Sequence, residues 1–253
     1  MTVDPNSLGL LGTIFTCFFF SVLLSRSKAN FLTLVLSALF GVCTIIISGS
    51  RTAFVALICL VVLALFVDTI RQNRFSLVSK STFIVLMLLF FIVSVAIASY
   101  FAPPLVERIS AALSPSAGGL IADVNFFTRV QLWKVCPAYL YGHPFGTLVP
   151  PFYALDMTID SYWVYVVTQG SLPYLLAFVL FILGMVNSGL ALIKSDVAMT
   201  KFIGYFTLLL ILAACIESLT IVAFLDSAVI FLVYTVLGIS VSAGSKTSRS
   251  SSS

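Results

Sequence analysis

The chain has 253 residues, of which 60% are hydrophobic and only 9% are charged. An ordinary soluble domain carries about 25% charged residues, so this composition excludes a soluble globular protein and indicates an integral membrane protein. The net charge of +4 comes from basic residues scattered along the chain. Proteins that bind nucleic acid concentrate positive charge on one face, so we expect no nucleic-acid partner.

The five cysteines are far apart in the sequence, and most lie inside apolar runs, where a thiol behaves as a small hydrophobic group. They predict no disulfide framework. The only histidine, His143, has no cysteine or second histidine at ligand spacing. We therefore expect neither a metal site nor a cofactor.

Seven apolar runs are long enough to cross a bilayer, which takes about 20 mostly apolar residues. These runs cover residues 8–25, 31–48, 53–70, 82–101, 172–193, 202–219 and 225–242. The sequence thus predicts an all-α fold, a polytopic membrane bundle of about seven spans. The first run should remain in the mature protein, because the residues before it contain Asp4 and lack the basic residues of a signal peptide.

Lys and Arg residues indicate the orientation, because short cytoplasmic loops carry an excess of them. With the N-terminus outside, nine of the thirteen basic residues fall on the cytoplasmic side. Four then lie outside: Arg51, Arg108, Arg129 and Lys134.

This topology divides the chain into four regions. Residues 1–101 form N-terminal transmembrane helices, 102–158 a long periplasmic loop, 159–242 the C-terminal transmembrane helices, and 243–253 a flexible, Ser-rich cytoplasmic tail. The loop is rich in aromatic residues, which disordered segments lack. We therefore expect short helices on the outer face, one of them over 124–140.

Two of the external arginines are candidate phosphate ligands. Arg51 lies in the turn Ser48-Gly49-Ser50-Arg51-Thr52, whose small residues allow close approach to a guanidinium that can bind phosphate through two hydrogen bonds. The alternative is an arginine that reaches lipid headgroups. Arg129 lies on the expected external helix, near Trp133 and without an adjacent acid. Its alternative is an ion pair with a nearby aspartate: Asp123, Asp156 or Asp160.

Two residues are candidates for acid–base chemistry, and two further carboxylates are candidates for supporting the site. Asp160 precedes an apolar helix at the membrane surface, where it could act as a base or simply cap the helix. His143, in a Gly- and Pro-rich turn, could act as an acid or base, as histidines often do in catalysis, or have a structural role. Glu217 and Asp226 flank the last external turn. Carboxylates near hydrocarbon are costly and so indicate function, although these two could instead hold Arg51 or Arg129.

Four external motifs follow one another along the chain. They are Ser50-Arg51-Thr52-Ala53, Arg129 with Trp133, Gly142-His143-Pro144-Phe145-Gly146, and Asp160-Ser161-Tyr162-Trp163 followed by Gly170 and Pro173. In this order and with this shared placement, they resemble the O-antigen ligase and polymerase superfamily of bacterial envelopes. The start of the chain, Asp4–Gly9, is also similar to the start of that family's conserved region. The resemblance covers residues 4–193.

The resemblance implies a polysaccharide polymerase-like glycosyltransferase of the bacterial inner membrane. Such an enzyme moves glycan from an undecaprenyl-diphosphate carrier to an acceptor glycan or lipid at the periplasmic face, without a metal. The implied partners are this lipid-linked glycan, the acceptor, membrane lipids and other polysaccharide-assembly proteins. The ligase branch carries a histidine where this chain has Asp160, so a polymerase is favoured over an O-antigen ligase.

The resemblance also implies roles for individual residues. Arg51 and Arg129 would bind the diphosphate, with Asp160 as the first candidate base and His143 as the second. Three further residues would support the site: Trp133, Glu217 and Asp226.

Two non-enzymatic interpretations remain open, a lipid-linked glycan transporter and a non-catalytic subunit of an envelope complex. A transporter of this anion needs basic groups deep in its spans, whereas every Lys and Arg here lies at a boundary or in a loop. This distribution favours the enzyme. Members of the family usually have additional upstream spans, so we expect a C-terminal portion or a shortened member.

Overall fold

The computed structural model describes residues 5–25, 30–71, 124–146 and 161–219, with a few single positions elsewhere. Within these ranges the regular structure is entirely helical. The six helices are α1 (Pro5–Ser25), α2 (Phe31–Ser48), α3 (Arg51–Arg71), α6 (Val124–Gly142), α8 (Tyr162–Ile193) and α9 (Ala198–Glu217). The predicted spans at 82–101 and 225–242, most of the long loop and the flexible tail lie outside the described residues.

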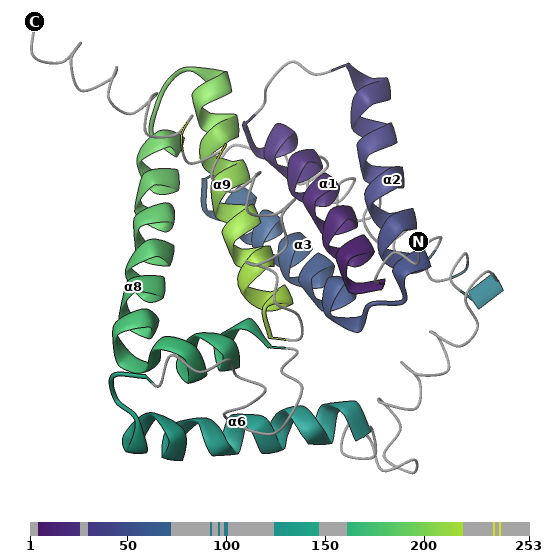
Figure 1. The fold of residues 1–253 in the computed structure, drawn as a ribbon. Helices are drawn as coiled ribbons and strands as arrows, with labels where there is room; N and C mark the ends of the chain where they lie inside the picture. Colours follow the sequence, from purple (N-terminus) through teal and green to yellow (C-terminus); the bar gives the residue numbers. More distant parts are fainter. Residues whose placement is uncertain are drawn as a thin grey trace, which may run out of the picture.

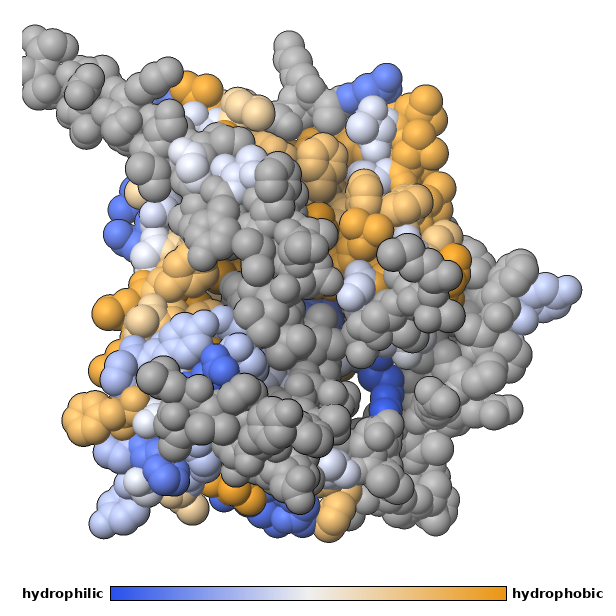
Figure 2. All heavy atoms as spheres, in the orientation of Figure 1, coloured by the Kyte–Doolittle hydropathy of each residue, from blue (hydrophilic) through white to orange (hydrophobic). Residues whose placement is uncertain are grey.

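Among the described residues, three helices are long and apolar enough to cross a membrane: Ser7–Ser25, Tyr162–Ile193 and Ala198–Glu217. The prediction of an all-α membrane protein is therefore confirmed at this level. Two shorter apolar stretches, Leu32–Ser48 and Arg51–Ala64, belong to α2 and α3. In Figure 2 the visible flank of α2 is coloured as hydrophobic, whereas hydrophilic colours gather around α6 at the lower edge.

Helix α1 is central, because it contacts α2, α3 and α9 (Figure 1). Against α2 the two backbones nearly touch: a Cβ atom added to Gly12 would lie 2.6 Å from the Gly41 carbonyl oxygen. Small residues allow this close approach, and van der Waals packing between closely spaced helices stabilises helix pairs in lipid. A similar contact joins α8 and α9, where a Cβ atom on Gly204 would lie 2.8 Å from the Gly189 carbonyl oxygen.

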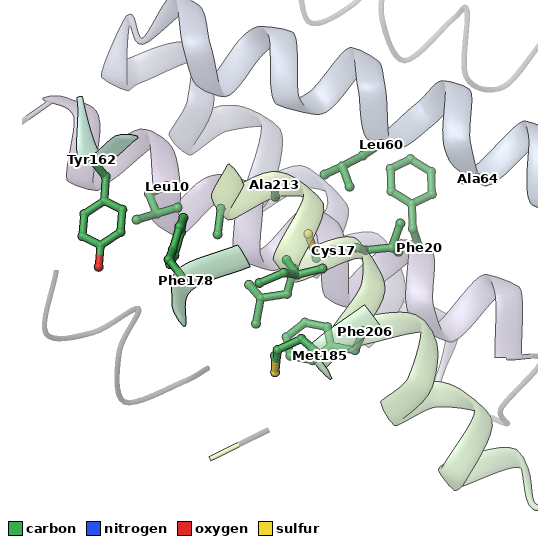
Figure 3. Close-up of a cluster of buried hydrophobic side chains, with 14 of the residues drawn as sticks. Leu10, Cys17, Phe20, Leu60, Ala64, Tyr162, Phe178, Met185, Phe206 and Ala213 are labelled. Carbon is green, nitrogen blue, oxygen red and sulfur yellow. The ribbon is translucent and has the colours of Figure 1, made fainter. Parts of the chain in front are cut away.

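A single apolar core joins four of the helices (Figure 3). Leu10, Cys17 and Phe20 come from α1, and the other labelled side chains come from α3, α8 and α9: Leu60, Ala64, Tyr162, Phe178, Met185, Phe206 and Ala213. All of them are buried. The core therefore fixes the relative positions of the helix ends that carry the candidate site.

Helix α8 is two helices joined by a sharp bend. Ser171 has φ 47° and ψ −136°, which is not helical, and Pro173 follows it. The first half, residues 162–170, crosses the end of the bundle, and the second half rises beside α9 (Figure 1). The upright half begins at Leu172, where the apolar pattern predicted the start of a span. Helix α6 lies across the same end and contacts α8, and it covers the predicted external helix at 124–140.

Candidate functional site at one end of the bundle

The turn between α2 and α3 ends one helix at Ser48 and starts the next at Arg51. Gly49 adopts the left-handed conformation (φ 63°, ψ 14°) that ends α2, a conformation that glycine tolerates better than other residues. The N–H of Ser50 donates to the hydroxyl of Ser48 at 3.1 Å. The hydroxyl of Ser50 in turn accepts from the N–H of Ala53 at 3.3 Å, which caps the first turn of α3.

This turn is suited to hold an anion. The first N–H groups of a helix and its dipole make the N-terminus electropositive, and Arg51, partly buried as the first residue of α3, adds a full positive charge there. No acidic residue lies in the first turn of α3. The binding of a phosphate by Arg51 stays a prediction, and the position of Arg51 at the start of α3 is compatible with it.

Helix α1 packs directly against this turn. A Cβ atom added to Gly9 would lie 2.9 Å from the Cβ atoms of both Ser50 and Ala53. Any side chain at position 9 would push the turn away from α1. The place of Arg51 is thus set by a backbone contact with α1.

Glu217, the last residue of α9, is fully buried. Its Oε1 atom lies 3.1 Å from the hydroxyl of Thr13, which also lies 3.0 Å from the Gly9 carbonyl oxygen. Thr13 is one helical turn from Gly9, so Glu217 and the Arg51 turn contact neighbouring turns of α1. The sequence-based prediction that Arg51 and Glu217 belong to the same end of the bundle agrees with this arrangement.

The start of α8 is tied to the end of α9. The Ser218 carbonyl accepts hydrogen bonds from the hydroxyl of Ser161 at 3.1 Å and from the N–H of Tyr162 at 3.0 Å. The indole N–H of Trp163 donates to the Cys215 carbonyl at 3.3 Å. One backbone N–H at the start of α8 and two side-chain donors thus bond to carbonyls at the end of α9, where helix carbonyls lack partners in their own helix.

Two of the predicted carboxylates, Asp160 and Asp226, lie outside the described residues. Asp160 immediately precedes Ser161, which is almost completely buried against α9.

Helix α6 carries Arg129 and Trp133, as predicted. The structure does not describe the side chain of Arg129 or the aspartates proposed as its alternative partners. Trp133 and Lys134 are exposed, whereas Leu132 is buried. Burial raises the pKa of the Cys136 thiol on the same helix, which keeps it protonated and unreactive.

His143 lies elsewhere at this end. Its turn is attached to the bend of α8, because the N–H of Leu172 donates to the Pro144 carbonyl at 3.1 Å. His143 is exposed, and its ring is 5.0 Å from that of Tyr139. The nine-residue first half of α8 separates this corner from Ser161 by about 14 Å. The Arg51 turn and Glu217 thus contact neighbouring turns of α1, and the start of α8 is bonded next to Glu217, whereas His143 lies at the opposite end of that short helix.

Three residues of the site have contacts that the sequence did not predict: Thr13, Ser161 and Trp163. Thr13 lies in a mostly apolar run, where a hydroxyl usually bonds only to its own helix. Nothing in the sequence spacing links it to Glu217, 204 positions away. A buried glutamate at a helix end does predict that some donor must face it.

Within the described ranges, no group of three His, Cys, Asp or Glu residues is placed to hold a metal ion. No protein-family model and no curated protein sequence matches the chain.

Proposed function

We propose that the chain is a polysaccharide polymerase-like glycosyltransferase of the bacterial inner membrane. It transfers glycan from undecaprenyl diphosphate to an acceptor sugar at the periplasmic face. The observation that supports the proposal is the meeting of the Arg51 turn, Glu217 and the start of α8 at one end of the bundle. A cation and a segment leading to a carboxylate are the parts that such a transfer requires.

In the proposed reaction, Asp160 accepts a proton from the acceptor hydroxyl as its oxygen attacks the anomeric carbon. The new glycosidic bond forms while the bond from that carbon to the diphosphate breaks, and undecaprenyl diphosphate leaves. Arg51 and Arg129 offset the negative charge that develops on the leaving diphosphate. Positioned bases of this kind typically contribute about 10² to 10⁴ in rate.

Binding of undecaprenyl diphosphate to the purified chain in lipid nanodiscs tests the proposal without knowledge of the sugar. Lysine keeps the charge of arginine but loses the planar fork, so Arg51→Lys and Arg129→Lys should each weaken binding by about tenfold or more. Arg71→Lys is the matched control, because Arg71 ends the same helix that Arg51 begins. If Arg51→Lys and Arg129→Lys bind the lipid as tightly as Arg71→Lys and the wild type do, then Arg51 and Arg129 are headgroup anchors. That result would contradict the proposal.

A further inference from the structure

A continuous series of contacts links the Arg51 turn to the start of α8. Ser50 and Ala53 press on the backbone of Gly9. The Gly9 carbonyl and Glu217 Oε1 both lie within hydrogen-bonding distance of the Thr13 hydroxyl.

The series continues past Glu217 along the chain. The Ser218 carbonyl accepts from both Ser161 and Tyr162. The residues in this series are buried, and Glu217, Ser218 and Thr13 are completely so. Water therefore cannot replace these bonds without opening the helix packing.

We propose that Glu217 is a positioning residue, which holds the diphosphate-binding turn and the segment beginning at Ser161 in a fixed relation through Thr13. This inference rests on the proposed function, because it assigns both segments to the same site. Glu217 does not touch the substrate. It acts by fixing the end of α9 against α1.

Glutamate at this position is costly, which argues for a role beyond packing. It ends α9, where the helix dipole disfavours negative charge, and it is fully buried at the edge of a membrane span. Alanine or leucine at this position would avoid the free-energy cost of burying a carboxyl group. The property that glutamate adds is a strong hydrogen-bond acceptor that reaches α1.

Two threonines on α1 provide a matched pair for the experiment. Thr13 and Thr16 are both buried, and the hydroxyl oxygen of each lies within hydrogen-bonding distance of the carbonyl four residues before it, at 3.0 and 2.9 Å. Only Thr13 has a hydrogen bond to Glu217. Valine removes either hydroxyl while keeping the shape, so the two variants differ in the link to α9.

The full chain in nanodiscs is examined by two measurements, hydrogen exchange of the first turn of α8 and affinity for undecaprenyl diphosphate. Thr13→Val and Glu217→Ala should raise amide exchange at residues 162–165 by about tenfold and weaken lipid binding by about fivefold or more. Glu217→Gln keeps an oxygen that accepts from Thr13. Its amide exchange at residues 162–165 and its lipid affinity should therefore stay close to those of the wild type. Thr16→Val should leave both unchanged.

Unchanged exchange at residues 162–165 in Glu217→Ala would overturn the inference, as would equal effects of Thr13→Val and Thr16→Val. Faster exchange with unaltered lipid binding would also overturn it, because the two segments would then be independent. Failure of the wild-type chain to bind undecaprenyl diphosphate would instead contradict the proposed function, and the exchange measurement would still decide whether Glu217 holds α8.

Discussion

The two ends of the first half of α8 are held in different ways. At the Ser161 end, the carbonyls of Cys215 in α9 and of Ser218 just after it accept three hydrogen bonds, and the side chains of Ser161 and Tyr162 are buried. At the Ser171 end, one tertiary hydrogen bond joins Leu172 to the Pro144 turn. Nearby Tyr141 and Phe145 are 91% and 83% exposed. Hydrogen bonds thus hold the first end against the end of α9, whereas at the second end Ser171 is buried and the neighbouring Leu172 is bonded to the turn that follows α6.

This difference indicates where chemistry can be positioned. A base must be held within a fraction of an ångström of its geometry by groups that cannot move. The Ser161 end, next to Glu217 and the Arg51 turn, meets this condition. The turn with His143 is exposed, so our proposal keeps His143 as the second candidate base.

The largest effect at the Ser171 end is expected at Gly146. This residue has φ 80°, and an added Cβ atom would lie 2.8 Å from the Gln169 carbonyl oxygen. Gly146→Ala should therefore lower the free energy of unfolding by about 2 kcal/mol, through backbone strain and the clash. Titration with SDS in mixed micelles, followed by circular dichroism, measures this quantity.

Gly142→Ala is the control for that experiment. It lies in the same segment, but nothing lies within 4 Å of its added Cβ atom. Equal destabilisation by both alanines would show that the turn does not rest on α8.

At the Ser161 end, Trp163→Phe tests the bond to α9. The ring contact with Phe178, at a centroid distance of 5.1 Å, can persist, while the hydrogen bond to the Cys215 carbonyl is lost. The expected cost is about 1 kcal/mol in the same titration. Trp133→Phe, at the exposed position on α6, should stay within about 0.5 kcal/mol of the wild type. A reversed order would mean that α9 does not hold the start of α8.

The smallest effect is expected at the bend itself. Ser171→Gly relieves a strained positive φ, worth about 1 kcal/mol or more, but adds the entropy cost of glycine and removes a hydrogen bond to the Val167 carbonyl. We expect stability within about 1 kcal/mol of the wild type. Ser188→Gly, inside the regular part of the same helix, lacks the relief and should lose about 1 kcal/mol. If Ser171→Gly is the more destabilising, the bend is not strained.

Helix positions could largely be predicted from the sequence, because apolar runs are a local signal. The run at 31–48 matches α2, and the external helix predicted at 124–140 matches α6 to within two residues. The structure extends α3 back to Arg51 and starts α9 before Lys201, since helices continue through the charged residues that end an apolar run.

The arrangement of the site could be predicted only in part. Charge alternation assigned Arg51 and Glu217 to one face. It could not pair Glu217 with Thr13, or Ser161 with Ser218, because such bonds depend on how the helices rotate about their axes. Glycines set that rotation by allowing backbone contact, as at Gly12 and Gly41.

The central claim is that the chain transfers glycan, with Asp160 as the base. The most direct test compares polymer formation from undecaprenyl-diphosphate-linked glycan by the wild type and by Asp160→Asn, with protein levels matched. Asparagine keeps the shape and most of the capping ability of aspartate but cannot take the proton. The account predicts a loss of rate of about 10² to 10⁴ at normal expression. Wild-type rates from Asp160→Asn would contradict it.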